Sequence, residues 1–226
     1  MEVIMAEKLI IFDCDGVLVD SEFVSCKVFS EVLSKYGYHV STEECIRRYT
    51  GINEEDCRQL IMAETGIHIP KDYWEAEETV LRKAFETELT PLLQPVLDAL
   101  VDLGLPRCVA SNSSRKHVIH CLETTNQLGY FDDLAIFSSQ QVKRAKPAPD
   151  LFLYAAKEMG FKPENCLVIE DSLIGANAAI AAGMKVFMFL GGTHALSDWY
   201  REKVAVNNKP MHATSHELAL AIRAAL

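Results

Sequence analysis

The sequence lacks the features that define several classes of protein. No apolar run approaches the roughly 20 residues that a membrane-spanning helix requires. Basic residues are in the minority, with Lys+Arg 22 against Asp+Glu 32 among 226 residues. The resulting formal net charge of −10 disfavours nucleic acids and anionic membranes as partners. The N-terminus has no basic start followed by a long apolar stretch, so we expect no secretory signal and a cytoplasmic location.

The cysteines form no C-x-x-C pair, and their number is odd, which favours reduced thiols over a disulfide framework. Cys14 stands between two aspartates, whose negative charge raises the pKa of a thiol and suppresses the thiolate. We therefore interpret Cys14 as a small buried residue and not as a nucleophile. Five of the seven histidines are scattered singly and indicate no metal site: His39, His68, His117, His120 and His194.

A pair of acids follows the first apolar run of the chain. Leu9-Ile10-Ile11-Phe12 is typical of a buried strand, and Asp13-Cys14-Asp15-Gly16 comes directly after it. Side chains of a strand alternate, so Asp13 and Asp15 are expected on one side and Cys14 on the other. Two adjacent carboxylates repel each other. Either a cation or a chemical reaction must account for them.

From about residue 91 onward, short apolar runs alternate with amphipathic segments. The strand-like runs are 106–110, 134–138, 166–170 and 186–190, and helical patterns lie near 94–104, 114–128, 149–160 and 173–182. This alternation predicts an α/β fold with a Rossmann-like parallel sheet and helices on both faces. Ligands of such sheets bind beyond the carboxyl ends of the strands. A capping box at Thr214-x-x-Glu217 predicts a closing helix.

Residues 21–89 differ from the rest because their pattern is helical, without strand-like runs. Val24, Val28 and Val32 recur at helical spacing, Ser41 and Glu44 form a capping-box start, and Asn53 can cap a further helix. We therefore expect a helical cap domain at residues 20–90. It would be inserted into a core domain made of residues 1–19 and 91–226.

Three further groups of polar residues lie at the ends of predicted strands. Ser111-Asn112-Ser113 precedes a helix and offers N–H groups and a hydroxyl to an anion, with an ordinary helix N-cap as the alternative. Lys146 precedes two prolines, which stiffen the chain and fix where Lys146 points. The alternative is an ordinary solvated lysine. Glu170 and Asp171 form a second pair of acids. Oxygen ligands at this density favour Mg²⁺.

Together these residues resemble the motifs of the haloacid dehalogenase superfamily. The resemblance extends over the chain, including a helical cap after the first motif. The matching segments, in chain order, are Asp13-x-Asp15-Gly16-x-x-x-Asp20, Ser111-Asn112, Lys146-Pro147-x-Pro149-Asp150 and Glu170-Asp171-Ser172-x-x-Gly175.

The resemblance implies phosphoryl transfer through an aspartyl-phosphate, with Asp13 as the nucleophile and Asp15 as the general acid and base. It also implies a Mg²⁺ ion held by the Asp13 and Asp171 carboxylates and the Asp15 backbone carbonyl, with Glu170 nearby. The groups expected to hold the phosphoryl oxygens are Ser111, Asn112 and Lys146. Electrostatics agrees, because an anionic nucleophile attacks an anionic phosphate only where positive charge offsets the repulsion.

Within the superfamily, the chain resembles β-phosphoglucomutase-like proteins and bacterial sugar-phosphate phosphatases, including 6-phosphogluconate phosphatase. Mutases of this group carry a cap histidine near Ser25 and an arginine just after the cap glycine, where this chain has Asn53-Glu54. An acid there would repel a second phosphate. We therefore expect a phosphatase acting on a small sugar phosphate such as 6-phosphogluconate, as a monomer or weak dimer. The alternatives are a hexose-phosphate mutase and a non-catalytic regulator that binds a phosphorylated metabolite.

Substrate choice is expected to depend on the cap. In this family a specificity loop faces the site, and the corresponding segment is Tyr49-Thr50-Gly51-Ile52-Asn53, with Gly51 as the predicted substrate contact. Arg47 and Arg48 are candidates to meet a substrate carboxylate or second anion. Solvated helix arginines are the alternative.

Overall fold

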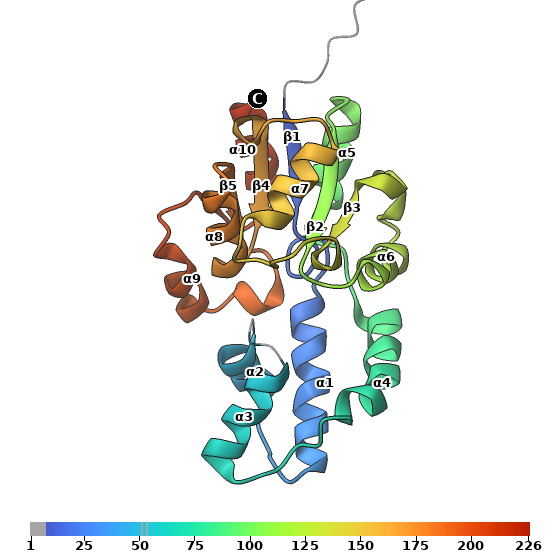
Figure 1. The fold of residues 1–226 in the computed structure, drawn as a ribbon, viewed down its shortest axis with the longest axis vertical. Helices are drawn as coiled ribbons and strands as arrows, with labels where there is room; N and C mark the ends of the chain where they lie inside the picture. Colours follow the sequence, from blue (N-terminus) through green and yellow to red (C-terminus); the bar gives the residue numbers. More distant parts are fainter. Residues whose placement is uncertain (1–7, 51, 53) are drawn as a thin grey trace, which may run out of the picture.

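A computed structural model describes residues 8–50, 52 and 54–226 of the chain. Its core is a six-stranded parallel sheet with strand order β3-β2-β1-β4-β5-β6 (Figure 1). Buried parallel strands are apolar on both faces, which explains the continuous apolar runs of the sequence. The strands are β1 (Leu9–Phe12), β2 (Arg107–Ser111), β3 (Ile136–Ser138), β4 (Cys166–Glu170), β5 (Lys185–Phe189) and β6 (Met211–His212).

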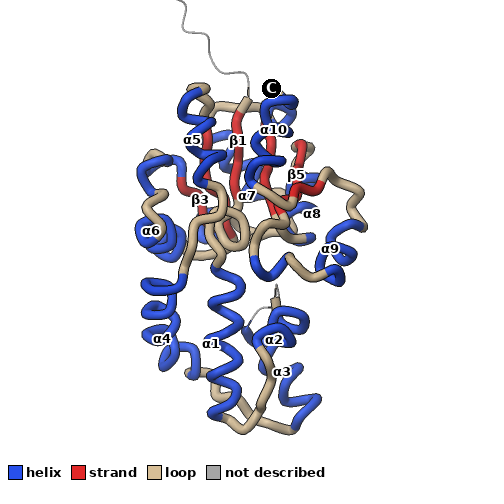
Figure 2. The backbone as a smooth tube through the Cα atoms, turned by 180° about the vertical axis from the view of Figure 1, so that it is seen from behind, coloured by secondary structure: helices blue, strands red, loops and turns tan. Residues whose placement is uncertain are grey.

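Helices cover both faces of this sheet, as Figures 1 and 2 show. They are α5 (Gln94–Asp102), α6 (Arg115–Thr124), α7 (Asp150–Glu158), α8 (Leu173–Ala181), α9 (Asp198–Ala205) and α10 (Ser215–Ala225). Successive side chains of β1 point to opposite faces of the sheet, so the hydrophobic core has one part on each face. Ile10 and Phe12 pack with α5, α6 and α10, whereas Leu9 and Ile11 pack with α7, α8 and α9. The predicted α/β class is confirmed.

The region of residues 21–88, here called the cap, lies beyond the carboxyl ends of the strands (Figure 1). Its helices are α1 (Ser21–Lys35), α2 (Thr42–Tyr49), α3 (Glu54–Thr65) and α4 (Tyr73–Glu88). They enclose a hydrophobic cluster of their own, centred on residues such as Leu33 and Ile61. The two chain crossings between cap and core run side by side, because the Asp20 N–H donates to the Thr90 carbonyl at 3.0 Å.

Several boundaries differ from the sequence-based expectation. The helix expected near 114–128 ends at Thr124, and Asn126 follows with φ of 57°, a conformation that ends helices. The strand expected at 134–138 begins at Ile136, and Leu134 lies exposed in the turn η2 (Asp133–Ala135). Helix α9 and strand β6 were not predicted, because both are short and carry little periodic pattern.

The other 3₁₀ turns are η1 (Leu128–Tyr130), η3 (Ser139–Gln141), η4 (Pro163–Asn165) and η5 (Thr193–Ala195). The predicted capping box of the last helix is present, with Thr214 and Glu217 as the reciprocal pair. Ser41 caps α2 by accepting the Glu44 N–H at 3.1 Å. In the described part of the chain, no helix has both the length and the apolar character needed to cross a membrane.

Candidate active site

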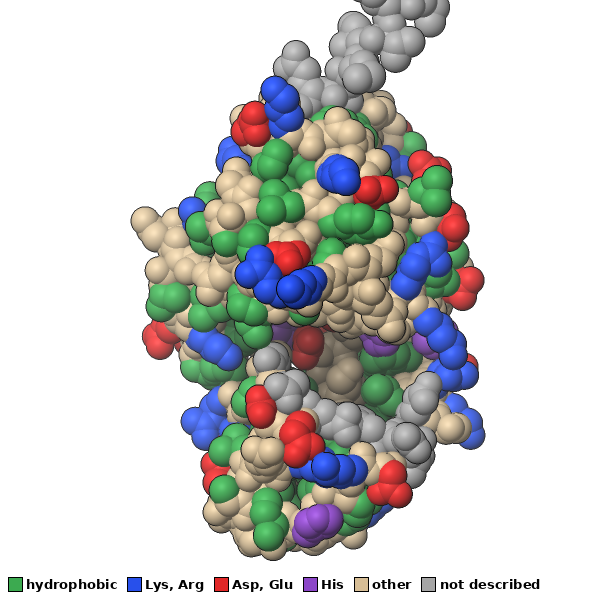
Figure 3. Space-filling model, viewed as in Figure 1, with side chains coloured by type: hydrophobic (Ala, Val, Ile, Leu, Met, Phe, Trp, Pro, Cys, Tyr) green, Lys and Arg blue, Asp and Glu red, His purple; other side chains and the backbone are tan. Residues whose placement is uncertain are grey.

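The polar groups predicted at strand ends meet where β1, β2 and β4 end. Asp13 follows β1, Ser111 closes β2 and Glu170 closes β4. Because β1 lies between β2 and β4 in the sheet, three motifs far apart in sequence become neighbours. Figure 3 shows a hollow between cap and core at this level, with acidic and histidine side chains in its walls.

Lys146 joins the two acidic motifs. Its Nζ donates to Asp13 Oδ1 at 2.8 Å and to Glu170 Oε1 at 2.6 Å, and its side chain is only 3% exposed. Burial raises the pKa of Asp13 well above its ordinary value, and Lys146 opposes that rise. Burial likewise raises the pKa of Glu170, and Lys146 again opposes that rise. For Lys146, the two carboxylates outweigh burial and raise its pKa. One ammonium thus offsets two buried acids.

Asp13, Glu170 and Asp171 form a cluster of oxygen ligands. One carboxylate oxygen from each lies within 4.8 Å of the others. The backbone of Gly16 passes so close to Asp171 that a Cβ atom there would overlap its carboxylate. An all-oxygen donor set of this kind suits a hard divalent cation such as Mg²⁺.

Asp15 is hydrogen-bonded at both carboxylate oxygens. Ser21 Oγ from the start of the cap donates to Oδ1 at 2.7 Å, and Ser113 Oγ donates to Oδ2 at 2.7 Å. His117 Nε2 lies 3.0 Å from Oδ1. Burial alone would raise the pKa of Asp15, but His117 and these hydroxyls lower it. Conversely, Asp15 outweighs burial and raises the pKa of His117 to about 11. Asp15 is therefore ionised in this arrangement.

Asn112 connects the second motif to the third. Its Nδ2 donates to the Lys146 carbonyl at 3.1 Å, and its Oδ1 accepts the Lys146 N–H at 2.9 Å. Both polar atoms of the side chain are therefore used to hold the backbone that carries Lys146. Ser111 is buried, and its Oγ accepts the Ser113 N–H at 3.0 Å. The Asn112 amide nitrogen carries a second N–H that this pairing does not use, so its side chain still has a donor for a phosphoryl oxygen.

The sequence indicated no metal site at five scattered histidines, but the fold brings two of them against carboxylates of the site. His117 contacts Asp15, and the buried His194 places Nε2 at 2.8 Å from Asp171 Oδ2. The turn that carries His194 also reaches the chain crossing that leads into the cap, because the Thr193 N–H donates to Asp20 Oδ1 at 3.0 Å. Sequence spacing gives no indication of these contacts, since each joins segments brought together by the fold.

The cap arginines are engaged within the cap. Arg47 pairs with Glu44 at 2.7 Å, and Arg48 pairs with Glu64 and donates to Tyr38 Oη at 3.0 Å. The structure therefore favours the alternative in which they are helix-surface arginines. Gly51 and Asn53, on which the predictions of a substrate contact and a helix cap rest, lie outside the described residues.

Gly175 provides a test of packing behind the acids. A Cβ atom on Gly175 would overlap the Glu170 carboxylate. We therefore expect Gly175→Ala to displace Glu170 from Lys146, to lower the free energy of unfolding by about 1–3 kcal/mol, and to reduce turnover. Thermal unfolding measures this loss. Gly129→Ala is the control, because a Cβ atom on Gly129 would meet no other part of the protein within 4 Å. Equal stabilities for the two variants would contradict the packing argument.

Comparison with known proteins agrees with this geometry. A family model described as haloacid dehalogenase-like hydrolase matches residues 10–189. The 6-phosphogluconate phosphatase of Escherichia coli (strain K12) is 33% identical over 192 residues, covering 82% of this chain and 83% of that protein.

Two solved structures share the fold. A haloacid dehalogenase-like protein from Agrobacterium tumefaciens str. C58 has a TM-score of 0.86 at 33% identity, covering 96% of this chain and 98% of its own. A HAD family hydrolase from Deinococcus radiodurans R1, with bound phosphate and sodium, has a TM-score of 0.82 at 28% identity, with coverages of 95% and 94%. The fold and site define a phosphoryl-transfer enzyme. The chain belongs to the haloacid dehalogenase-like hydrolase family and is a phosphatase of that superfamily.

Proposed function

We propose that this enzyme hydrolyses small sugar phosphates with Mg²⁺, through an aspartyl-phosphate on Asp13. The observation that carries the proposal is the contact of 2.8 Å between Asp13 and Lys146, beside the acid cluster that includes Asp171. The lysine offsets negative charge where a carboxylate must approach a phosphate. The Deinococcus relative with bound phosphate and the E. coli 6-phosphogluconate phosphatase support the substrate class.

In the first step, an Asp13 oxygen attacks phosphorus while the bond from phosphorus to the substrate oxygen breaks. Asp15 gives its proton to that leaving oxygen. Asp15 is ionised when it accepts hydrogen bonds from Ser21 and Ser113. The negative charge of a bound phosphate favours its protonation before the step. In the second step, the ionised Asp15 removes a proton from water, and the resulting oxygen displaces Asp13 from phosphorus.

The described residues fit a resident Mg²⁺. The Asp13 and Asp171 carboxylates and the Asp15 backbone carbonyl would hold the ion, whose charge offsets that of the phosphoryl group. Glu170 accepts hydrogen bonds from Lys146 at one oxygen and from Ser172 at the other. We therefore assign Glu170 to holding Lys146 near the metal. Ser111, Asn112 and Lys146 would bind the phosphoryl oxygens.

Hydrolysis is favoured over a mutase reaction by the state of the cap arginines. A mutase must grip a second phosphate, whereas Arg47 and Arg48 are both paired with glutamates inside the cap. In the sequence, Asn53-Glu54 stands where mutases of this group carry an arginine, so the chain has no basic residue at that place. These features are better suited to a substrate that carries a single phosphate.

A phosphate-release panel with Mg²⁺ tests the proposal. It should contain 6-phosphogluconate, hexose phosphates, phosphoglycolate and nucleotides. Release from sugar phosphates in preference to nucleotides is expected. Conversion of β-glucose 1-phosphate into glucose 6-phosphate without free phosphate would identify a mutase. Tight binding without any turnover would identify a regulator.

Asp15→Asn tests the acid role within the same assay. We expect kcat/KM for a sugar phosphate to fall by about 10²–10⁴-fold, because an alkoxide leaving group needs a proton. For p-nitrophenyl phosphate, kcat/KM should fall much less, since nitrophenolate leaves without one. Equal losses for both substrates would contradict the assignment of Asp15 as the acid that protonates the leaving group.

A further inference from the structure

A second group of potential metal ligands lies behind Asp15. Asp15, His117 and Cys121 each offer one ligand atom, and these atoms all lie within 4.8 Å of one another. His117 Nε2 is 3.0 Å from Asp15 Oδ1 and 3.5 Å from Cys121 Sγ. His117 and Cys121 are four residues apart on α6, so they project from the same face of that helix.

The donor set differs from that of the acid cluster at Asp13. A carboxylate, an imidazole and a thiol are the three ligand types that zinc binds in proteins, whereas Mg²⁺ takes oxygen ligands. Tetrahedral zinc with ordinary bond lengths places its nitrogen, oxygen and sulfur ligands about 3.3–3.6 Å apart. The separations between His117 and its two neighbours are within a few tenths of an ångström of that range.

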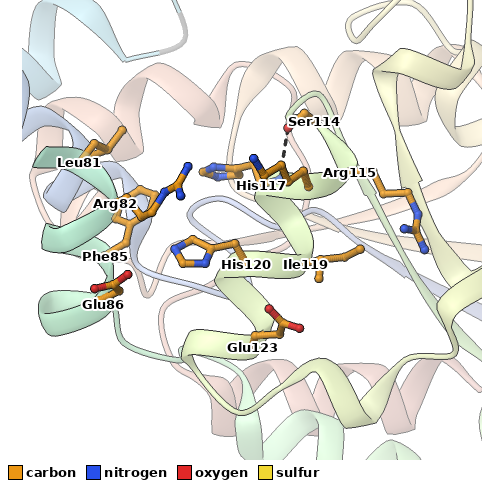
Figure 4. Close-up of a pocket in the computed structure, with 11 residues that line it drawn as sticks. Leu81, Arg82, Phe85, Glu86, Ser114, Arg115, His117, Ile119, His120 and Glu123 are labelled. Carbon is orange, nitrogen blue, oxygen red and sulfur yellow. Dashed lines mark hydrogen bonds between the residues drawn. The ribbon is translucent and has the colours of Figure 1, made fainter. Parts of the chain in front are cut away.

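The cluster can be reached from outside the core. The side chains of His117 and Asp15 are 30% and 18% exposed, whereas Cys121 is buried behind them. His117 also lines a cavity of about 640 Å³ between cap helix α4 and core helix α6. Figure 4 shows its ring extending from α6 toward Arg82 and Phe85 of cap helix α4, and the rings of His117 and Phe85 are in contact. Of the three ligands, His117 is the one that lines this cavity, so an ion entering here would meet His117 first.

We propose that Asp15, His117 and Cys121 form a binding site for Zn²⁺, and that zinc bound there inhibits the enzyme. Binding releases the Cys121 thiol proton and the proton between His117 and Asp15. Three protein ligands leave a fourth position for water. A coordinated Asp15 carboxylate can neither give nor take a proton. The inhibition rests on the proposed role of Asp15, whereas the binding does not.

Cobalt provides a readout that is independent of activity. Titration of the reduced, Mg²⁺-loaded protein with Co²⁺ should give a thiolate-to-cobalt charge-transfer band that saturates at one equivalent and that Zn²⁺ abolishes. Cys121→Ser and Cys121→Ala should both remove this band. Cys45→Ser, at a buried thiol of the cap, is the matched control and should keep it. No band, or a band that survives in both Cys121 variants, would overturn the site.

Inhibition is measured separately, at saturating Mg²⁺. The Zn²⁺ concentration for half inhibition should rise at least about tenfold in Cys121→Ser, and the control should match the wild type. Equal zinc sensitivity of Cys121→Ser and wild type would overturn the inhibitory role, because zinc would then act elsewhere. If the protein releases no phosphate from any substrate but shows the Cys121-dependent band, the proposed function fails and the zinc site stands.

Discussion

Asp13→Asn is expected to abolish phosphate release, with a loss of at least about 10⁴-fold in kcat. The amide that replaces the carboxylate cannot form the acyl phosphate, and the neighbouring carboxylates are engaged elsewhere, Glu170 with Lys146 and Asp171 with His194. Lys146 Nζ lies 2.8 Å from Asp13 but is held as a cation between two acids. Rapid quench with a ³²P-labelled substrate should show labelled wild-type protein and unlabelled Asp13→Asn.

The same variant should remain folded. Burial raises the pKa of Asp13, so the ionised carboxylate opposes folding at neutral pH, and its removal carries little penalty. We expect a thermal midpoint no lower than that of the wild type. Asp102→Asn, at an exposed acid of α5, is the matched control for activity and should retain full turnover. Substantial turnover by Asp13→Asn would rule out the aspartyl-phosphate.

Lys146→Met is expected to remove both activity and much of the stability. Without the ammonium, Asp13 and Glu170 remain buried with no cation between them. Loss of one partner of a buried ion pair costs about 3–5 kcal/mol. Chemical denaturation in metal-free buffer measures this loss. Lys157→Met, at an exposed lysine of α7, should change stability by less than about 0.5 kcal/mol.

The pH dependence of this deficit has a defined sign. Burial raises the pKa values of Asp13 and Glu170 in the folded protein, so the native state binds more protons than the unfolded state. Stability then falls as pH rises through those raised values. Lys146 opposes this rise in the two pKa values, so its removal should raise them further. The loss of stability in Lys146→Met should therefore be larger at pH 8 than at pH 6. A deficit that does not change with pH would show that the lost charge is not its cause.

Much of the fold was predictable because the patterns that specify it are local. The apolar run Leu9–Phe12 and the later runs indicated strands, and the regular alternation with helices indicated a parallel sheet. The acids at Asp13 and Glu170 followed directly from the ends of two such strands. In contrast, α9 and β6 escaped prediction because elements so short carry almost no periodicity.

The candidate site also has features that the sequence predicted and features that it did not. The strand-end motifs were evident because a parallel sheet always brings the carboxyl ends of its strands to one edge. The partner that each side chain contacts was not evident from the sequence. Asn112 holds the backbone of Lys146, and Arg47 pairs with Glu44 instead of facing a substrate. Such choices depend on which partner lies within hydrogen-bond reach.

The sequence by itself determined the strand ends, the acids that follow them and the helical segment that forms the cap, because these depend on residue order and short-range periodicity. Tertiary structure decided that His117 lies against Asp15 across 102 residues and that His194 lies against Asp171 across 23 residues. Neither spacing is a repeat of a helix or strand. The positions of α6 and of the turn after β5 place these rings 3.0 Å and 2.8 Å from two carboxylates of the candidate site.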